Sequence, residues 1–293
     1  MTLQEEMTTG INTDTWASLW RRLTPLYDEG EAKAVVRMVL EERLGMTTAD
    51  IYTDGIAQLT NEARDELESI MLRLESGEPV QYVLGYAEFL GRRFAVGRGV
   101  LIPRPETEEL CQWIIRDMDG GDGGDILDIG TGSGCIAVTL AADVAEAAVT
   151  AWDLSDAALI CCEANARRLG VMVDAVRQNA LTPPDDTARW DIIVSNPPYI
   201  AESERSTMHR NVTEHEPPEA LFVSDDDPVL YYRAICQYAI KALKPDGALY
   251  FEINPRFAAE VAAEAREAGF QDVIMCDDCY GKTRMMKAKN RAR

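Results

Sequence analysis

The decapeptide from Asp191 to Ile200 contains residue types suited to chemistry on a planar polar group. It reads Asp-Ile-Ile-Val-Ser-Asn-Pro-Pro-Tyr-Ile, so a short β-branched run ends at Ser195 and Asn196 before two prolines. Proline lacks a backbone N–H and fixes φ, and the residue before a proline is restricted to extended backbone. The pattern predicts a buried strand that ends in a rigid tip carrying a carboxamide.

Ligands of open α/β sheets bind at the carboxyl ends of the strands. A carboxamide held there by Asn196, followed by the aromatic ring of Tyr199, predicts recognition of a planar polar group. The alternative is an ordinary Asn-Pro turn, because short motifs of this kind also occur without function. A second motif upstream favours the first interpretation.

The second motif is a glycine-rich turn between a predicted strand and a predicted helix. Residues 125–134 read Asp-Ile-Leu-Asp-Ile-Gly-Thr-Gly-Ser-Gly and lead into an apolar helix start at Cys135. Glycines let a ligand approach the backbone closely. The spacing differs from the dinucleotide pattern Gly-x-Gly-x-x-Gly, and the Lys-Ser/Thr of a phosphate loop is missing. The next strand ends in Asp153, about 20 residues beyond the glycines, where a carboxylate could bind ribose hydroxyls.

Strands and helices alternate along the rest of the chain, which predicts a mostly parallel sheet with helices on both faces. The expected helices are 157–169, 231–243 and 258–268, and the expected strands are 171–176, 191–195, 248–252 and 272–275. Basic residues recur from Lys282 to Arg293, and this segment is expected to be a solvated, disordered end.

The first 76 residues place apolar side chains at helical spacing and predict a small amphipathic bundle; Ala63, Leu67, Ile70, Met71 and Leu74, for example, would share one helical face. The composition then changes to Tyr, Phe, Val and Gly, and Gly91-Arg92-Arg93 between apolar residues predicts a hairpin turn. The expected domains are a helical bundle at 1–76, a β-hairpin linker at 77–103 and an α/β domain at 104–293.

The composition restricts the classes of function. The 293 residues carry a formal net charge of −21, which disfavours nonspecific binding to phosphate backbones. Two histidines and seven cysteines without a zinc pattern predict no metal site. No apolar run approaches the roughly 18 residues of a membrane helix, and no secretory signal is visible. A cytoplasmic protein that does not bind membranes is expected.

Together these motifs resemble the class I S-adenosylmethionine-dependent methyltransferases, and more closely the HemK/PrmC family of peptide chain release factor glutamine methyltransferases. The resemblance covers nearly the whole chain. Its most specific parts are Asn196-Pro197-Pro198-Tyr199, the linker from Gly77 to Glu108 with Arg104 between two prolines, and Asp128-x-Gly130-x-Gly132-x-Gly134. It extends to Glu216-Pro217, Ala220-Leu221, Asp278, Gly281 and Arg284. The tetrapeptide alone also resembles that of DNA adenine methyltransferases, whereas the helical domain and the proline-arginine linker favour the protein substrate.

The resemblance implies a Rossmann-like class I methyltransferase domain with a mostly parallel seven-stranded sheet, a small N-terminal helical bundle and a linking β-hairpin. It implies transfer of a methyl group from S-adenosyl-L-methionine, with S-adenosyl-L-homocysteine as the product. The acceptor would be the side-chain amide nitrogen of the glutamine in the Gly-Gly-Gln loop of class I release factors, a modification that modulates translation termination. The helical bundle would dock the release factor, and no stable binding of nucleic acid is expected.

The implied site residues form three groups. Substrate and catalytic roles fall to Asn196, Pro197, Pro198 and Tyr199. Cofactor contacts fall to Asp128, Gly130, Thr131, Gly132, Ser133, Gly134, Asp153, Asn179, Ala180 and Asn196. Candidate pocket residues are Phe89, Arg104 and Glu106, of which Arg104 and Glu106 would either shape the pocket or pair with each other.

The chain departs from the family pattern at two of these positions. The family commonly has an acidic residue after the third strand, where this chain has Asn179 followed by Ala180. An amide can still bind the adenine amino group, although it accepts through one oxygen rather than two. Ser133 stands where threonine is frequent.

Two other functions remain open. The exocyclic amine of adenine poses the same planar recognition problem, so a DNA or RNA adenine amino-methyltransferase is the first, although such enzymes usually carry basic grooves. The second is a noncatalytic cofactor-binding or scaffold protein, which the intact glycine turn, Asp153 and the Asn196 tip disfavour.

Overall fold

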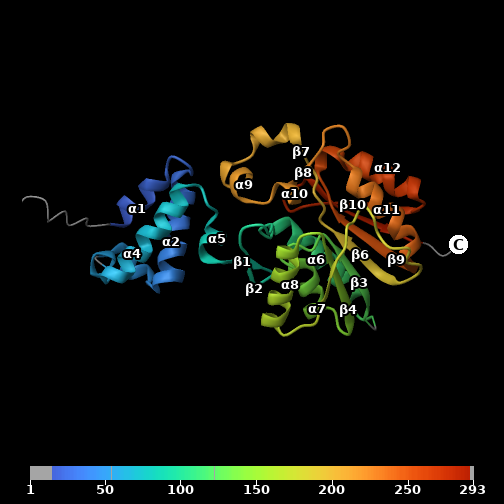
Figure 1. Cartoon of the computed structure of the whole chain (residues 1–293), viewed down its shortest axis with the longest axis horizontal. Helices are drawn as coiled ribbons and strands as arrows, with labels where there is room; N and C mark the ends of the chain where they lie inside the picture. The colour runs from blue at the N-terminus through green and yellow to red at the C-terminus, as the bar shows by residue number, and fades with distance from the viewer. Residues whose placement is uncertain (1–14, 54, 122, 291–293) are drawn as a thin grey trace, which may run out of the picture. The chain divides into compact units, whose positions relative to one another are not determined.

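The structure, a computed structural model, describes residues 15–53, 55–121 and 123–290. The chain divides into two compact units, Met1–Leu84 and Gly85–Arg293 (Figure 1). Residues 1–14 of the predicted bundle and residues 291–293 of the predicted basic end lie outside the described residues.

The N-terminal unit is helical because its sequence supplies both the helix ends and a buried face. Thr15 and Thr47 each form a capping box, and Gly45 ends the second helix with φ 63°, in the left-handed region. The elements are α1 (Trp16–Leu23), α2 (Glu29–Leu44), α3 (Thr48–Tyr52), η1 (Ile56–Gln58), α4 (Asn61–Glu75) and α5 (Val80–Leu84). The predicted α4 face is buried at Leu67, Ile70, Met71 and Leu74, whereas Ala63 is only half-buried. The predicted helical bundle is confirmed.

Helix α5 lies inside the range 77–103, where a hairpin linker was expected. Pro79 fixes a helical φ before it, and the Pro79 carbonyl accepts the N–H groups of Tyr82 and Val83. The buried Glu78 carboxylate binds Arg73, with Arg73 Nε 2.8 Å from Glu78 Oε2. These contacts join residues 78–84 to the end of α4, so the first unit extends to Leu84 rather than to residue 76.

The predicted hairpin forms from β1 (Tyr86–Phe89) and β2 (Arg92–Ala95), which pair antiparallel. Its turn is Leu90-Gly91, one residue earlier than expected, and both residues have positive φ, 45° and 72°. Two successive positive φ values are typical of the type I′ turn that joins twisted strands tightly.

The second unit is built on a seven-stranded sheet with the order β10-β11-β9-β6-β3-β4-β5. The parallel strands are β3 (Gly124–Ile129), β4 (Ala147–Asp153), β5 (Asp174–Arg177), β6 (Trp190–Ser195) and β9 (Leu243–Glu252). β11 (Thr283–Lys289) runs antiparallel between β9 and β10 (Asp272–Asp277). The chain order reverses between β3 and β6, a switch point at which such sheets bind ligands.

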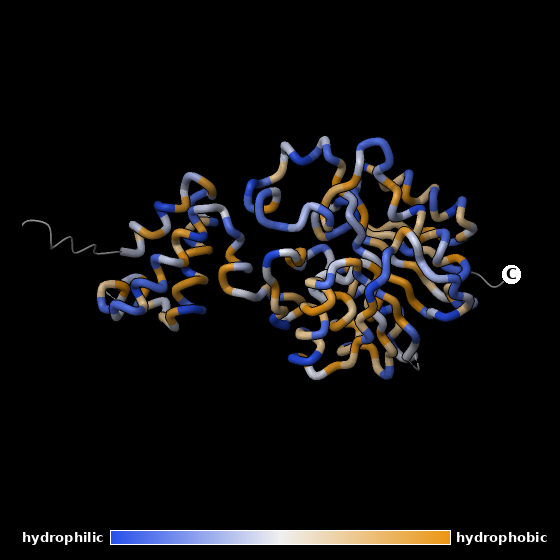
Figure 2. The backbone as a smooth tube through the Cα atoms, in the orientation of Figure 1, coloured by the Kyte–Doolittle hydropathy of each residue, from blue (hydrophilic) through white to orange (hydrophobic). Residues whose placement is uncertain are grey.

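Helices cover both faces of this sheet (Figure 1). One buried cluster includes side chains of α6 (Pro105–Met118), α7 (Cys135–Asp143) and α8 (Asp156–Leu169); the other includes side chains of α11 (Leu230–Ala242) and α12 (Ala258–Ala268). Figure 2 shows the hydrophobic residues concentrated along the strands between these layers. The predicted fold class is confirmed. None of the described helices has the length and apolarity that crossing a bilayer requires.

The segment after β6 is made of short elements that return the chain to the carboxyl edge of the sheet. They are β7 (Ile200–Ala201), η2 (Glu202–Thr207), α9 (Arg210–His215), α10 (Pro218–Leu221) and β8 (Phe222–Val223). β7 pairs with β8, which closes the segment into a loop. After β9, η3 (Pro255–Phe257) leads into α12.

The prediction of a disordered basic end was wrong for Lys282 to Asn290. Met286 and Ala288 of β11 are fully buried, and Lys287 is only 8% exposed. The Lys287 ammonium binds the Asp117 carboxylate at 2.5 Å, while its aliphatic stem lies among buried neighbours. The buried charge of Lys287 is tolerated in β11 because Asp117 of α6 supplies the counterion. Asp117 lies 170 positions away in the sequence.

The buried position of β11 predicts that Met286→Ala destabilises the second unit. Removing a fully buried methionine side chain leaves a cavity and should lower the free energy of unfolding by about 2–5 kcal/mol. Lys289→Ala is the control, since Lys289 is an exposed residue of the same strand. Urea unfolding measures both variants, and equal stabilities would contradict the placement of β11 in the sheet.

Candidate active site

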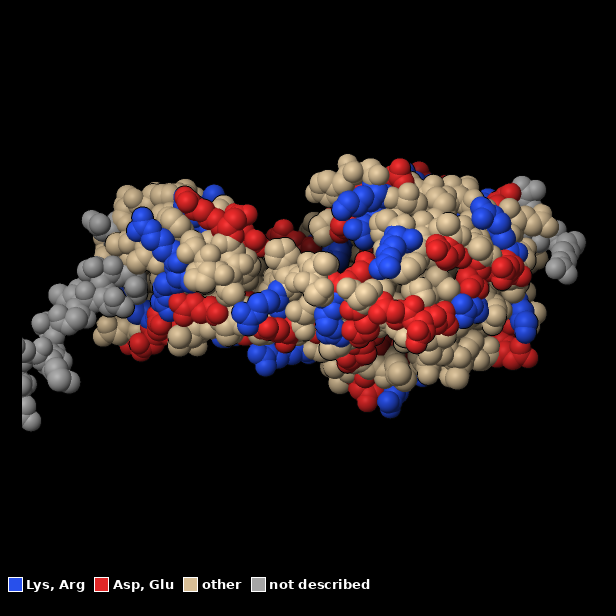
Figure 3. All heavy atoms as spheres, turned by 90° about the horizontal axis from the view of Figure 1, so that it is seen from above, with Lys and Arg blue, Asp and Glu red and all other residues tan. Residues whose placement is uncertain are grey.

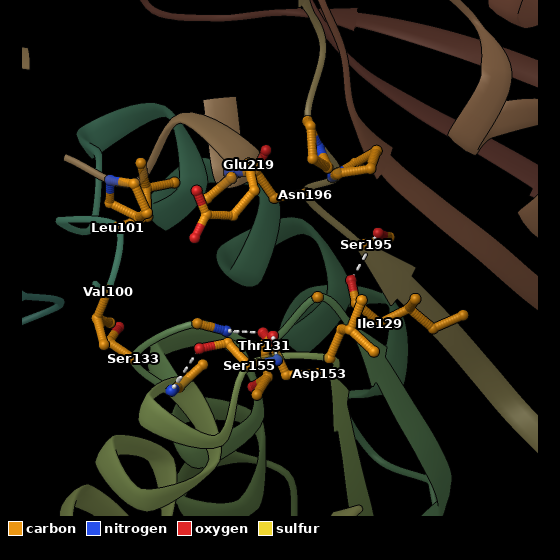
Figure 4. Close-up of a pocket in the computed structure, with 18 of the residues that line it drawn as sticks. Val100, Leu101, Ile129, Thr131, Ser133, Asp153, Ser155, Ser195, Asn196 and Glu219 are labelled. Carbon is orange, nitrogen blue, oxygen red and sulfur yellow. Dashed lines mark hydrogen bonds between the residues drawn. The ribbon is translucent and has the colours of Figure 1, made fainter. Parts of the chain in front are cut away.

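A cavity of about 500 Å³ lies at the carboxyl ends of β3, β4, β5 and β6, within the second unit (Figure 4). Four sequence segments that follow these strands line it: Ile129–Ser133, Asp153–Asp156, Arg177–Ala180 and Ser195–Pro198. The segment Gly99–Arg104 also lines it from outside the sheet, as do Pro217, Glu219 and Ala220. The cavity therefore sits at the switch point between β3 and β6.

The glycine turn after β3 forms the floor of this cavity. Gly130, Gly132 and Gly134 have φ values of 78°, 55° and 79°, which side chains rarely allow. The N–H groups of Gly130 and Thr131 both donate to the Trp152 carbonyl, at 2.8 and 3.0 Å. The third glycine comes early because α8 packs against it: a Cβ on Gly134 would lie 2.7 Å from Cys162 Sγ. Gly134 thus serves helix packing, whereas Gly130 and Gly132 line the cavity.

Asp153 holds the glycine turn from the end of β4. Its Oδ2 accepts from Gly132 N and its Oδ1 accepts from Ser155 N, both at 2.9 Å. Burial raises the pKa of this carboxyl, while the backbone donors act in the opposite direction. Each carboxylate oxygen keeps a further lone pair, so the group can also accept from hydroxyls of a ligand.

Asp128 is completely buried beneath the glycine turn and does not line the cavity. Its Oδ2 accepts from Thr131 Oγ1 at 2.6 Å and from Ala137 N at 3.3 Å, which fixes the turn to the start of α7. Its Oδ1 has no hydrogen-bond partner among the described residues. Burial raises the pKa of Asp128 to about 7.

Asn179 and Ala180 line the cavity at the end of β5. The Asn179 Oδ1 accepts from Leu181 N at 2.9 Å, which closes a local turn. The single oxygen of this side chain therefore already accepts one backbone hydrogen bond. One lone pair of this oxygen remains to accept from a ligand.

Asn196 lies at the tip of β6, at the cavity (Figure 4). Ser195 Oγ donates to the Ile129 carbonyl at 2.6 Å and fixes this tip to the end of β3. The Asn196 Nδ2 donates to Thr107 Oγ1 at 3.2 Å. Its Oδ1 has no hydrogen-bond partner in the described part of the chain, so it can accept from a ligand. Pro197 and Pro198 line the cavity beside it.

Tyr199 does not line the cavity; its hydroxyl donates to Glu252 Oε1 at 2.9 Å. The other oxygen of Glu252 accepts from Thr107 Oγ1 at 2.6 Å. Burial raises the pKa of Glu252, and the hydrogen bonds from Thr107 and Tyr199 lower it. The sequence pattern did not single out Thr107 or Glu252 for the site, although each is a polar residue at the start of a helix or the end of a strand.

Arg104 lines the cavity and binds Glu216 rather than Glu106. Arg104 Nη2 lies 2.6 Å from Glu216 Oε1, and Glu216 Oε2 accepts from Ile102 N at 3.0 Å. Glu216 is 3% exposed, so this pair fixes the linker to the loop after β7. Glu106 is not among the lining residues.

The placement of Phe89 in a pocket was wrong. Phe89 is fully buried in the core beneath the hairpin and packs edge-to-face on Phe94, with ring centroids 5.7 Å apart. Alternation along β1 turns its side chain toward α6 and α7.

Comparisons with known proteins identify the relatives of this chain. Residues 19–85 match the family model described as the PrmC N-terminal domain, and residues 108–218 match the methyltransferase small domain. The chain is 41% identical over 273 residues to a protein of Bacteroides thetaiotaomicron named release factor glutamine methyltransferase, covering 93% of this chain and 98% of that protein. A protein of the same name from Flavobacterium psychrophilum is 39% identical over 272 residues, covering 92% and 95%.

Solved structures share the fold. A methyltransferase from Pyrococcus furiosus superposes with a TM-score of 0.50 at 14% identity, covering 80% of this chain and 100% of that one. A Thermus thermophilus 16S rRNA N2 G1207 methyltransferase, solved with AdoMet and guanosine, also has a TM-score of 0.50 at 19% identity, covering 70% and 50%. At these identities the likeness concerns the fold alone.

The buried Asp128 carboxyl makes stability depend on pH in a defined direction. Its pKa is near 3.9 in an unfolded chain and about 7 in the folded protein, so the folded state binds the extra proton between these values. The free energy of unfolding should fall as pH rises toward 7, by about 1.4 kcal/mol per unit, and level off above it.

Asp128→Asn should remove this contribution because the amide does not titrate. Urea unfolding of both proteins from about pH 5.5 to 8.5 gives the difference in their unfolding free energies at each pH. A difference that stays constant over this range would contradict a raised pKa for Asp128.

Proposed function

Since the chain belongs to the family of release factor glutamine methyltransferases, we propose that it transfers a methyl group from S-adenosylmethionine to the side-chain amide nitrogen of the glutamine in the Gly-Gly-Gln loop of peptide chain release factors. The observation that carries the proposal is the Asn196 side chain at the cavity, with its Nδ2 held by Thr107 and its Oδ1 open to a ligand. A planar amide substrate needs such an acceptor.

The lining of the cavity fits S-adenosylmethionine. Gly132 has no atom within 4 Å of the place where a Cβ would stand, and Gly130 has only the Asn196 carbonyl at 4.0 Å, so a ligand can approach this backbone closely. The turn from Gly130 to Ser133 would hold the methionine and ribose portion, and the Asp153 carboxylate would accept from the ribose hydroxyls. Asn179 and Ala180 would lie beside the adenine. When bound, the cofactor supplies an electrophilic sulfonium methyl group.

The main task of the protein is to position the acceptor. A carboxamide nitrogen is a poor nucleophile because its lone pair is delocalised into the carbonyl. The Asn196 Oδ1 and the Pro197 carbonyl would accept the two N–H bonds of the substrate amide, which localises the lone pair and directs it at the methyl group. No strong base is needed before attack, since the nitrogen loses its proton after it has become cationic.

Roles for the remaining candidates follow from their contacts. Tyr199 does not line the cavity. Its hydrogen bond to Glu252 would instead hold the tetrapeptide 196–199 in place. Arg104, held by Glu216, would shape the substrate entrance. The N-terminal helical unit would bind the release factor while the Gly-Gly-Gln loop of the release factor enters the cavity. The separate family match over residues 19–85 supports this role.

A nucleic-acid adenine methyltransferase is the less favoured function. The formal net charge of −21 opposes binding to a phosphate backbone. On the face drawn in Figure 3, acidic and basic side chains are interspersed rather than separated into a basic stripe. The two relatives described above carry the release factor name and cover 93% and 92% of this chain.

The test is incubation of the purified protein with methyl-labelled S-adenosylmethionine and a release factor, in parallel with a release factor whose loop glutamine is changed to alanine. Label on the first and not on the second is the expected result. Equal labelling of both, or transfer to DNA or RNA in place of the release factor, would contradict the proposal.

Replacement of Asn196 by alanine should abolish most of the methyl transfer. Loss of an acceptor that orients the reacting amide is expected to lower kcat on the order of 100-fold or more, with cofactor affinity largely retained. Asn61→Ala is the control, since Asn61 is an exposed residue of α4. Single-turnover rates and cofactor titration measure the two effects, and wild-type turnover by Asn196→Ala would remove this residue from the mechanism.

A further inference from the structure

We propose that Thr107 and Glu252 are positioning residues, which determine that the oxygen and not the nitrogen of the Asn196 carboxamide faces the substrate. The inference rests on the proposed function, because it concerns the acceptor that would hold the substrate amide. Neither residue would contact the reacting atoms. Glu252 acts on Thr107, and Thr107 acts on Asn196.

Three hydrogen bonds connect the tip of β6 to a buried carboxylate. Asn196 Nδ2 lies 3.2 Å from Thr107 Oγ1, Thr107 Oγ1 lies 2.6 Å from Glu252 Oε2, and Tyr199 OH lies 2.9 Å from Glu252 Oε1. Thr107 is 2% exposed and Glu252 is 1% exposed, so water does not compete for these groups. The chain of bonds joins the start of α6, the end of β9 and both ends of the tetrapeptide.

The number of available protons determines which group donates and which accepts in each of these three hydrogen bonds. Glu252 is assigned as ionised because each of its two oxygens has a hydroxyl group within 2.9 Å, and these hydrogen bonds and the Arg284 charge oppose the effect of burial. An ionised carboxylate only accepts, so Thr107 and Tyr199 each donate their single hydroxyl proton to Glu252. With its proton used, Thr107 can only accept from Asn196. The amide nitrogen is the only donor of the Asn196 side chain, so it must face Thr107, and the oxygen is left to face the cavity.

The reversed amide would place two acceptors against each other. Asn196 Oδ1 would then face the lone pairs of Thr107 Oγ1, while the NH2 group would face the cavity and repel the N–H groups of a substrate amide. The protein therefore needs a device that excludes this orientation, since a carboxamide has nearly the same shape both ways. Thr107 is well placed for it because its hydroxyl caps no backbone N–H of α6 and is committed to this network.

A purely structural role for Thr107 is the competing explanation, and isosteric variants separate the two. Thr107→Val keeps the shape and removes the hydroxyl; it should lower kcat by roughly 10-fold to 100-fold, as loss of an outer-shell partner does, while the cofactor dissociation constant changes little. Thr107→Ser restores the hydroxyl and should recover most of kcat. Thr139→Val is the matched control, since Thr139 is a fully buried threonine of α7 outside the network.

Glu252→Gln tests the direction of the network without removing an atom. The glutamine NH2 can donate to Thr107, which frees the Thr107 proton for Asn196 Oδ1 and permits the reversed amide. This variant should lose kcat to a similar extent while cofactor binding is retained. If Thr107→Val fails to fold, Glu252→Gln alone tests the inference.

The outcomes for the inference and for the proposed function are distinguishable. The variants are compared on whichever acceptor the wild-type protein methylates, so the identity of the acceptor tests the proposed function and the variant ratios test the network. Wild-type kcat in Thr107→Val or in Glu252→Gln would overturn the inference, as would a loss that Thr107→Ser does not recover. Absence of methyl transfer to any acceptor by the wild-type protein would overturn both.

Discussion

The buried carboxylate of Glu252, at the end of β9, is the constraint on which the substrate side of the site depends. Burying an ionised carboxylate is unfavourable unless donors surround it, and here the hydroxyls of Thr107 and Tyr199 supply those donors. The Glu252 carbonyl also accepts from Tyr232 OH at 3.0 Å, and its backbone pairs with Met285 of β11. One residue therefore fixes the start of α6, the β6 tip, α11 and the antiparallel strand relative to one another.

The cofactor side of the site depends on carboxylates of a different kind. Asp128 and Asp153 both accept backbone N–H groups of the glycine turn and its surroundings, and Asp128 also accepts from the Thr131 hydroxyl, so the two groups hold this turn in place. The two halves meet where Ser195 Oγ donates to the Ile129 carbonyl. This division suits the proposed reaction, whose barrier would be lowered by alignment: one half would shape a cavity for the methyl donor, and the other would orient the acceptor.

The sequence predicts those parts of the molecule that local pattern determines. The β-branched run before Asn196, the glycine turn and the alternation of strands and helices led to the correct fold class, because periodicity and glycine spacing reflect nearby geometry. Partners distant in the sequence were not foreseeable. Lys287 is buried because Asp117 lies opposite it, Arg104 binds Glu216 rather than the nearby Glu106, and Thr107 meets Glu252 across 145 positions. Phe89 was misassigned for the same reason, since only the fold shows which face of β1 meets the core.

Neutron diffraction from deuterated crystals would distinguish the two orientations of the Asn196 carboxamide, because it locates the protons on which that orientation depends. We expect a deuteron on Thr107 Oγ1 directed at Glu252 Oε2, none on the Glu252 carboxylate, and the ND2 group of Asn196 directed at Thr107. A deuteron on Glu252 directed at Thr107, with the Thr107 deuteron directed at the Asn196 oxygen, would contradict it. In that arrangement the amide nitrogen would face the cavity, and Asn196 could not accept from a substrate amide.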